Sequence, residues 1–120
     1  MAKFKFRDNT LKLEIEDKTY ILDISNFKDT KKLLTIADEA VKVSEDGNTP
    51  ETIEKMMTMM ENAVDTILGE GATKEIFEDR EVNFLDLIDL LVFLSNEISA
   101  FRSEKLEKVY SVNRKDELVD

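Results

Sequence analysis

The sequence predicts an α+β, mainly helical fold in which an N-terminal antiparallel β-meander packs on a bundle of three to four helices. Two observations support this prediction. Apolar and polar residues alternate along residues 3–24, and from about residue 29 the apolar spacing becomes helical. The 120 residues have room for one hydrophobic core. We therefore expect a single domain over residues 1–110, followed by a flexible C-terminal tail over residues 111–120.

The alternating N-terminal region divides into three predicted strands. Residues 11–15 alternate apolar with charged side chains, residues 19–24 are rich in β-formers, and a turn at residues 16–18 separates them. Upstream, residues 3–7 alternate two phenylalanines with three basic residues, and residues 8–9 offer a second turn. A two-stranded ribbon is marginally stable alone, so we expect this β-meander over residues 3–24 to lean on the helices.

The helical part, residues 29–110, divides at residues that favour helix starts. For the first helix, Ser25 and Asp29 are alternative caps. Thr49 followed by Pro50 marks the start of the second, and Asn83 is a suitable N-cap for a long last helix. The predicted helices span residues 29–44, 50–68, 72–77 and 84–110.

Cysteine and histidine are both absent from the chain. Their absence excludes disulfides, thiol chemistry, His-dependent triads and the usual structural zinc sites. No segment approaches the roughly 18 uninterrupted apolar residues of a membrane span, and the N-terminus lacks the apolar core of a secretory signal. We therefore expect a soluble, cytoplasmic protein that is not an enzyme, holds no cofactor or metal and binds no membrane.

The formal charge of −10 is unevenly distributed. Residues 44–100 hold three Lys/Arg against fourteen Asp/Glu, which disfavours binding to nucleic acid. The excess of acidic residues either keeps the protein soluble, or it imitates the phosphates of DNA so that the protein inhibits a nucleic-acid enzyme. Asp86 and Asp89, three positions apart on a helix, suit acid–base work or a divalent cation. Because no calcium-loop spacing accompanies them, we interpret them as a solvated helix face.

The segment 84–94 is the most apolar in the chain, with Asp86 and Asp89 its only polar positions. Helical spacing gathers one broad apolar face, made of Phe84, Leu87, Ile88, Leu91, Leu94 and Ile98. Leu85 and Val92 lie well off that face, and Phe93 falls on the far side. Two interpretations stay open: a central core helix, or a helix whose surplus apolar surface closes on another protein or a second copy. The surplus predicts a homo-oligomer.

Four of the five methionines lie within residues 56–60. Three of them fall on the apolar face of the second predicted helix, and Met59 flanks it. Methionine is flexible and polarizable, so it re-packs against partners of varied shape. We expect Met59, Leu85, Val92 and Phe93 to contribute to a protein-binding surface, and we name no catalytic, cofactor-binding or metal-binding residue.

Several stretches in a fixed order resemble one protein family. Residues 3–11 lead into residues 20–24, and later come residues 67–77 with their Leu-Gly-x-Gly and Ile-Phe motifs, then Arg80 and the apolar helix. This order resembles the tail-assembly chaperones of long-tailed bacteriophages, or prophages, of Gram-positive hosts. The resemblance covers about residues 3–100 and lies in overall pattern, with no residue-level motif to transfer.

The resemblance implies a non-enzymatic morphogenesis factor. Proteins of this kind bind the long, helical tape-measure protein, keep its apolar helices soluble and recruit tail-tube subunits in the host cytoplasm. They are absent from the mature virion, and a longer form often arises by programmed frameshifting. An acidic inhibitor that mimics DNA, or a generic helical protein-interaction or regulatory domain, is the alternative. The missing catalytic chemistry and the apolar helix agree with a reversible binder of hydrophobic helices.

Overall fold

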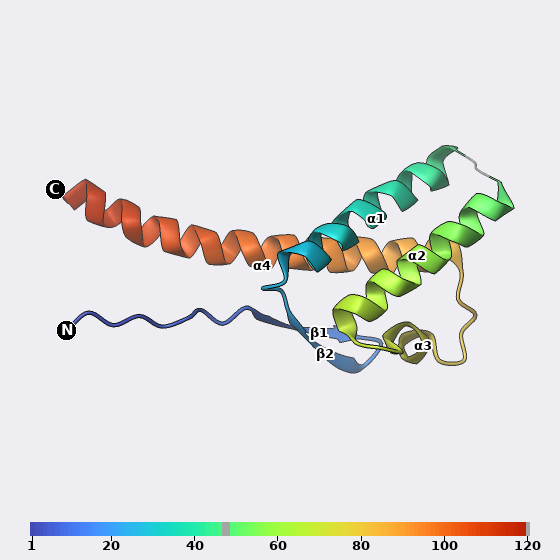
Figure 1. Ribbon diagram of the computed structural model, residues 1–120, viewed down its shortest axis with the longest axis horizontal. Coiled ribbons are helices and arrows are strands. Elements are labelled where there is room, and N and C mark those ends of the chain that lie inside the picture. Colours follow the sequence, from blue (N-terminus) through green and yellow to red (C-terminus); the bar gives the residue numbers. More distant parts are fainter. Residues whose placement is uncertain (47–48, 120) are drawn as a thin grey trace.

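The computed structural model describes residues 1–46 and 49–119, with side chains described for residues 1–46 and 49–104. The fold is α+β and mainly helical, as the sequence predicts: a two-stranded antiparallel sheet precedes four helices (Figure 1). The elements are β1 (Thr10–Ile15), β2 (Lys18–Asp23), α1 (Phe27–Asp46), α2 (Pro50–Leu68), α3 (Ala72–Phe77) and α4 (Phe84–Val119).

The strands β1 and β2 form a hairpin joined by a two-residue turn. Ile15 pairs with Lys18, and Glu16 and Asp17 between them both have positive φ, as the tightest hairpin turns require. One face of the hairpin is buried through alternate residues, namely Leu13, Ile15, Tyr20 and Leu22. The intervening side chains face solvent, which is the alternation that the sequence predicts for a sheet with one wet side.

The third strand predicted over residues 3–7 is wrong. Residues 1–9 belong to no strand, although the backbone carbonyl of Asn9 accepts from the backbone N–H of Ile24 at 3.0 Å. Phe4 and Phe6 are 79% and 85% exposed. Asp8 marks the junction, where its Oδ1 accepts a hydrogen bond from the backbone N–H of Thr10 at 2.9 Å. Apolar alternation indicates an extended backbone, but it carries no information on whether a partner strand is available. Here the segment leaves the body of the molecule (Figure 1).

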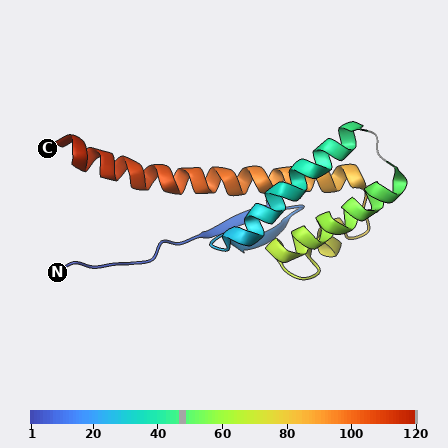
Figure 2. The ribbon, with the colours of Figure 1, turned by 45° about the horizontal axis from the view of Figure 1, so that its top comes forward.

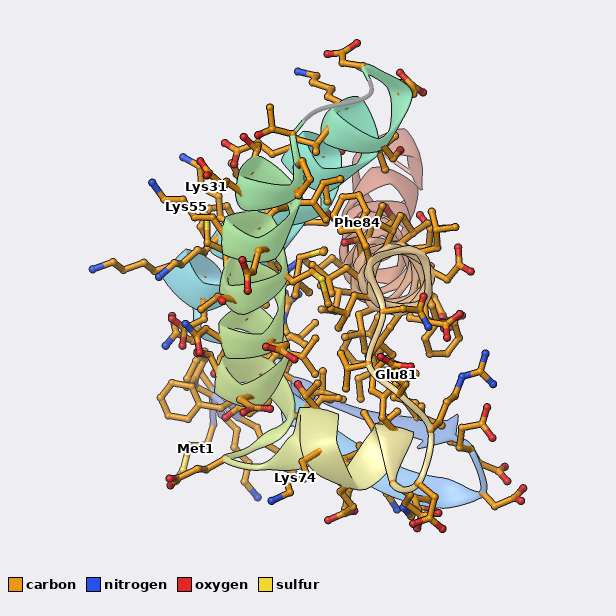
Figure 3. All side chains as sticks on the ribbon, turned by 90° about the vertical axis from the view of Figure 1, so that its right-hand side faces the viewer. Met1, Lys31, Lys55, Lys74, Glu81 and Phe84 are labelled. Atoms are coloured by element: carbon orange, nitrogen blue, oxygen red, sulfur yellow. The ribbon has the colours of Figure 1, made fainter. Side chains whose placement is uncertain are left out.

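The helices α1, α2 and α4 lie on one side of the hairpin, and α3 lies beside it (Figure 3). Their apolar faces meet the buried face of the hairpin in one continuous core. The centre of the core contains Leu22, Leu33, Met60, Val64 and Leu91. Packing against three helices therefore supplies the stability that a two-stranded ribbon lacks alone.

The apolar face predicted for the last helix faces this core. Leu87, Ile88, Leu91, Leu94 and Ile98 are all buried, and Phe84 is partly buried. The core-helix interpretation is therefore right for this face of α4. Off this face, Leu85 and Phe93 remain exposed, and the homo-oligomer that such surplus apolar surface predicts stays a prediction.

Two of the predicted helix caps are confirmed. The Oγ1 of Thr49 accepts from the backbone N–H of Thr52, and the Oδ1 of Asn83 accepts from that of Asp86 at 2.9 Å. For α1 both alternative caps are wrong. Asn26 fills that role, since its Oδ1 accepts from the backbone N–H of Asp29 at 3.2 Å.

The last helix is longer than predicted. Residues 111–119 continue α4 as helix beyond the predicted end at residue 110, and Asp120 lies outside the described residues. The last glycine of the chain is Gly71 and the only proline is Pro50, so no helix breaker follows Asn83. The end of α4 projects beyond the other helices (Figure 2). No helix within the described part of the chain is both long and apolar enough to cross a membrane.

Arg102 joins α4 to the start of α1. Its guanidinium donates to the buried hydroxyl of Thr30 and, at 3.2 Å, to the backbone carbonyl of Ile24. The same guanidinium lies 4.8 Å from the ring centroid of Phe27. These contacts fix α4 against the point where the hairpin passes into α1.

The short helix α3 is held by a side chain of α2. Its N-cap is Gly71, which offers no side-chain acceptor. The Oδ1 of Asp65 instead accepts from the backbone N–H of Thr73 at 2.9 Å and from its hydroxyl at 2.8 Å. Thr73 is buried, so these donors have little access to water. Asp65 therefore acts as a cap supplied by the preceding helix.

We expect Asp65→Ala to lower the free energy of unfolding by about 1–3 kcal/mol, because it leaves the buried backbone N–H of Thr73 without its acceptor. The hydroxyl of Thr73 keeps the backbone carbonyl of Glu61 as an acceptor, at 3.3 Å. Asp38→Ala removes an exposed carboxylate from α1 and should leave stability nearly unchanged. Urea denaturation of both variants measures the difference. Equal midpoints for the two would show that Asp65 is not the cap of α3.

Candidate functional site

The four residues predicted for protein binding occupy two surfaces. On α4, Leu85 is 66% and Phe93 is 38% exposed, on the side of the helix opposite its buried face. Val92 lies at the edge of this side and is partly buried against the core. We call Leu85, Val92 and Phe93 the outer face of α4. Most of the Leu85 side chain is in contact with water, as the helical spacing predicts.

Met59 lies elsewhere. It is 37% exposed and lines a small groove between α1 and α2, of about 150 Å³, with Leu33, Ile36 and Ala63. The buried face of α4 is the one that packs on α1 and α2, so the outer face of α4 points away from this groove. The structure therefore does not bring Met59 together with the other three residues.

A larger hollow of about 570 Å³ lies where the hairpin turn, the segment after α3 and the first turns of α4 converge. Its floor is apolar, since Ile15, Ile76 and Phe77 are buried there. Its rim carries six carboxylates against one guanidinium, that of Arg80. The rim carboxylates belong to Glu16, Asp17, Glu78, Asp79, Asp86 and Asp89. We call this site the acidic hollow.

Contacts between the hairpin and α3 hold two walls of the acidic hollow in place. The Nζ of Lys18 forms an ion pair with Glu78, and the hydroxyl of Tyr20 donates to the Oε1 of Glu75 at 2.9 Å. Burial and this hydrogen bond raise the pKa of Tyr20 to about 12. The phenol therefore stays protonated over the whole physiological pH range.

The third wall is the start of α4, where Asp86 has several partners. Its Oδ2 accepts from the side-chain amide of Asn83 at 2.6 Å and from the Nε of Arg80 at 2.9 Å. These hydrogen bonds lower the pKa of Asp86, and the one from Asn83 has the larger effect. Asp86 is therefore charged at physiological pH as part of the helix cap, so it is poorly suited to donate or accept a proton there.

The two groups with shifted pKa values at the acidic hollow are poorly matched to proton transfer near neutral pH. Proton transfer needs a group whose pKa lies near the working pH, and the shifts at Tyr20 and Asp86 move away from neutrality. Among the described residues, no three acidic side chains converge closely enough to hold a metal ion. An apolar floor under a charged rim instead fits a peptide segment that carries apolar and basic side chains.

Sequence analysis finds part of the acidic hollow and misses the rest. The pair Asp86 and Asp89 is visible from its spacing, Glu78 and Asp79 precede it in the same acidic region, and the structure places all four at the rim. The contribution of Glu16 and Asp17 depends on the hairpin packing beside α3, which no local pattern encodes.

The fold and these surfaces define a small helical domain with an N-terminal hairpin, an acidic hollow and a partly apolar outer helix face. The chain belongs to a family of unknown function, DUF6673, whose sequence profile matches residues 8–117. No curated protein and no solved structure matches the chain.

We expect Tyr20 to ionise near pH 12, against about 10 for an unperturbed tyrosine. A folded-state pKa above the unfolded value means that this contribution to stability is complete below pH 10 and is lost as the pH rises towards 12. Ultraviolet titration of Tyr110→Phe, which leaves Tyr20 as the only tyrosine, measures the value. Ionisation near pH 10 while the chain is still folded would contradict the contact with Glu75.

We expect calcium and magnesium to leave the melting temperature unchanged, because Asp86 is occupied by the cap and Asp89 is exposed. Thermal melting with and without each ion tests this expectation, with Asp86→Asn plus Asp89→Asn as the matched variant. A rise in melting temperature that the double variant abolishes would establish a cation site at the start of α4.

Proposed function

We propose that this protein is a non-enzymatic tail-assembly chaperone of a long-tailed bacteriophage or prophage. In this role it binds a long helical protein of the tape-measure type and helps to recruit tail-tube subunits in the host cytoplasm. The observation that carries the proposal is the outer face of α4, where Leu85 and Phe93 present apolar side chains to solvent. The order of motifs along residues 3–100 supports the same class of protein.

The outer face suits an amphipathic partner helix. Leu85 and Phe93 are eight positions apart on α4, which is about 12 Å along a helix. That spacing matches the separation of apolar anchors on a facing helix, and Asp89 lies between them. An apolar strip that carries a charge binds reversibly, which is what a chaperone released before the virion is complete requires.

The groove that contains Met59 offers a second apolar contact, on the other side of the molecule. Its volume of about 150 Å³ accommodates one large side chain and not a helix. Met59 therefore contributes less than the outer face of α4 to the proposed binding of a helical partner.

The acidic surface favours this proposal over mimicry of DNA. A DNA mimic needs carboxylates spaced like phosphates along an open surface. The six carboxylates of the acidic hollow instead surround an apolar floor, which is suited to protein and not to imitation of a polyphosphate backbone.

We expect Phe93→Asp to weaken partner binding by at least about tenfold, since a buried Phe contributes about 1.5–3 kcal/mol to a contact. The new carboxylate stands four positions from both Asp89 and Glu97 on α4, and such like-charge pairs cost a few tenths of a kcal/mol each, so the fold should lose little stability. Thermal melting checks the fold. The amount of a co-expressed, long, coiled-coil-rich protein that stays soluble checks binding.

Asn96→Asp is the matched control, because it adds the same charge to the exposed side of α4 without removing an apolar side chain. A normal melt and full solubilisation by Phe93→Asp would exclude the outer face as the binding site. Unfolding of Phe93→Asp, with Asn96→Asp unaffected, would show that Phe93 belongs to the core.

A further inference from the structure

The residues before Asp8 form a basic, aromatic segment without a partner in the described structure. Residues 1–7, which we call the arm, carry Lys3, Lys5 and Arg7 and no acidic residue. Phe4 and Phe6 are exposed and contact each other edge to face, with ring centroids 4.9 Å apart. An exposed pair of aromatic rings gains substantially from burial, so such a segment is suited to dock on another surface.

The acidic hollow complements the arm in both charge and polarity. In an extended chain, successive side chains point to opposite sides, so Phe4 and Phe6 share one side and the basic residues the other. The two rings match the apolar floor formed around Ile76 and Phe77. Long basic side chains reach sideways to carboxylates at a rim. Glu78 and Asp86 already pair with Lys18 and Arg80, so the rim offers the arm the carboxylates of Glu16, Asp17, Asp79 and Asp89.

The arm and the acidic hollow of one chain lie apart. The arm lies two residues before the start of β1 and runs away from the body, whereas the hollow lies at the hairpin turn, at the other end of that strand (Figure 1). Figure 3 looks along the molecule from the end at which α4 begins, with the loop that carries Glu81 in front and Met1 behind. To reach the hollow of its own chain, the arm would have to reverse its direction. It can reach the hollow of a second copy without doing so.

We propose that the arm of one copy docks in the acidic hollow of a second copy. A reciprocal exchange of arms closes a dimer, whereas a one-way contact between these different surfaces is head to tail and propagates into a closed ring or an open chain. This inference goes beyond the chaperone function and is independent of it, because it uses neither the outer face of α4 nor a partner protein.

Exchange of charges between arm and hollow tests this contact. Lys3→Glu with Lys5→Glu reverses the arm. Glu16→Lys with Asp79→Lys and Asp89→Lys reverses the rim at exposed carboxylates other than the capping Asp86, because three carboxylates then face three lysines and Arg80. In sedimentation equilibrium of the full chain, we expect self-association of the wild type and a dissociation constant at least about tenfold higher for each variant alone. An equimolar mixture of the two variants should restore association, because each arm then meets a rim of opposite charge.

Asp38→Lys with Glu39→Lys and Glu54→Lys is the control, since it makes the same change of charge as the reversed rim on exposed residues of α1 and α2. This control should associate like the wild type. We also expect association of the wild type to weaken as salt is raised, because the paired charges lie at an exposed rim.

Three results would overturn the inference: a wild type that stays monomeric at high concentration, association that survives reversal of the arm, or a mixture of folded variants that remains monomeric. Melting temperatures show whether each variant is folded. If the reversed rim unfolds the domain, Phe4→Ser with Phe6→Ser tests the contact instead. These two residues lie outside the core, so their replacement should not unfold the domain. Wild-type association of that variant would also overturn the inference.

Discussion

Burial of one face of α4 is the constraint on which the rest of the structure depends. The hairpin has only two strands and its buried side is short, so it persists only against a larger apolar surface. Leu87, Leu91, Leu94 and Ile98 are all fully buried in the core that the hairpin shares with α1 and α2. Arg102 then fixes the same helix to the start of α1 through Thr30. In this way α4 fixes the positions of the hairpin, α1 and α2.

The acidic hollow is a consequence of this arrangement. The start of α4 lies near α3, and the hairpin packs beside α3 through Lys18 and Tyr20. Three segments with local acidic residues are thus brought together, although none of them is unusually acidic for a surface segment. The like charges at the rim repel one another, and a basic partner relieves that repulsion.

Local patterns in the sequence predict much of the fold. Thr49 with Pro50, and Asn83, define helix starts correctly because capping depends on a few adjacent residues. The spacing of residues 84–98 predicts which side of α4 is buried, and therefore that Leu85 and Phe93 are exposed. These features need only helical geometry and polarity.

Features that depend on distant partners escape the same analysis. The strand predicted at Phe4 and Phe6 fails because extension does not guarantee pairing. The cap that Asp65 supplies to α3 and the contacts of Arg102 join residues that no periodic pattern relates. For the candidate site, the outer face of α4 is predictable, whereas the acidic hollow requires the packed structure.

The proposed division of α4 into a core face and a partner-binding face is tested most directly by thiol labelling, since the chain has no cysteine of its own. Phe93→Cys places a thiol on the outer face, and Ser95→Cys places one at a buried position with little change in volume. We expect the first to react rapidly and the second to be protected in the free chain. A long, coiled-coil-rich partner should then slow the reaction of Phe93→Cys alone. Equal protection of both thiols in the free chain, or rapid labelling of Phe93→Cys with the partner bound, would contradict this division.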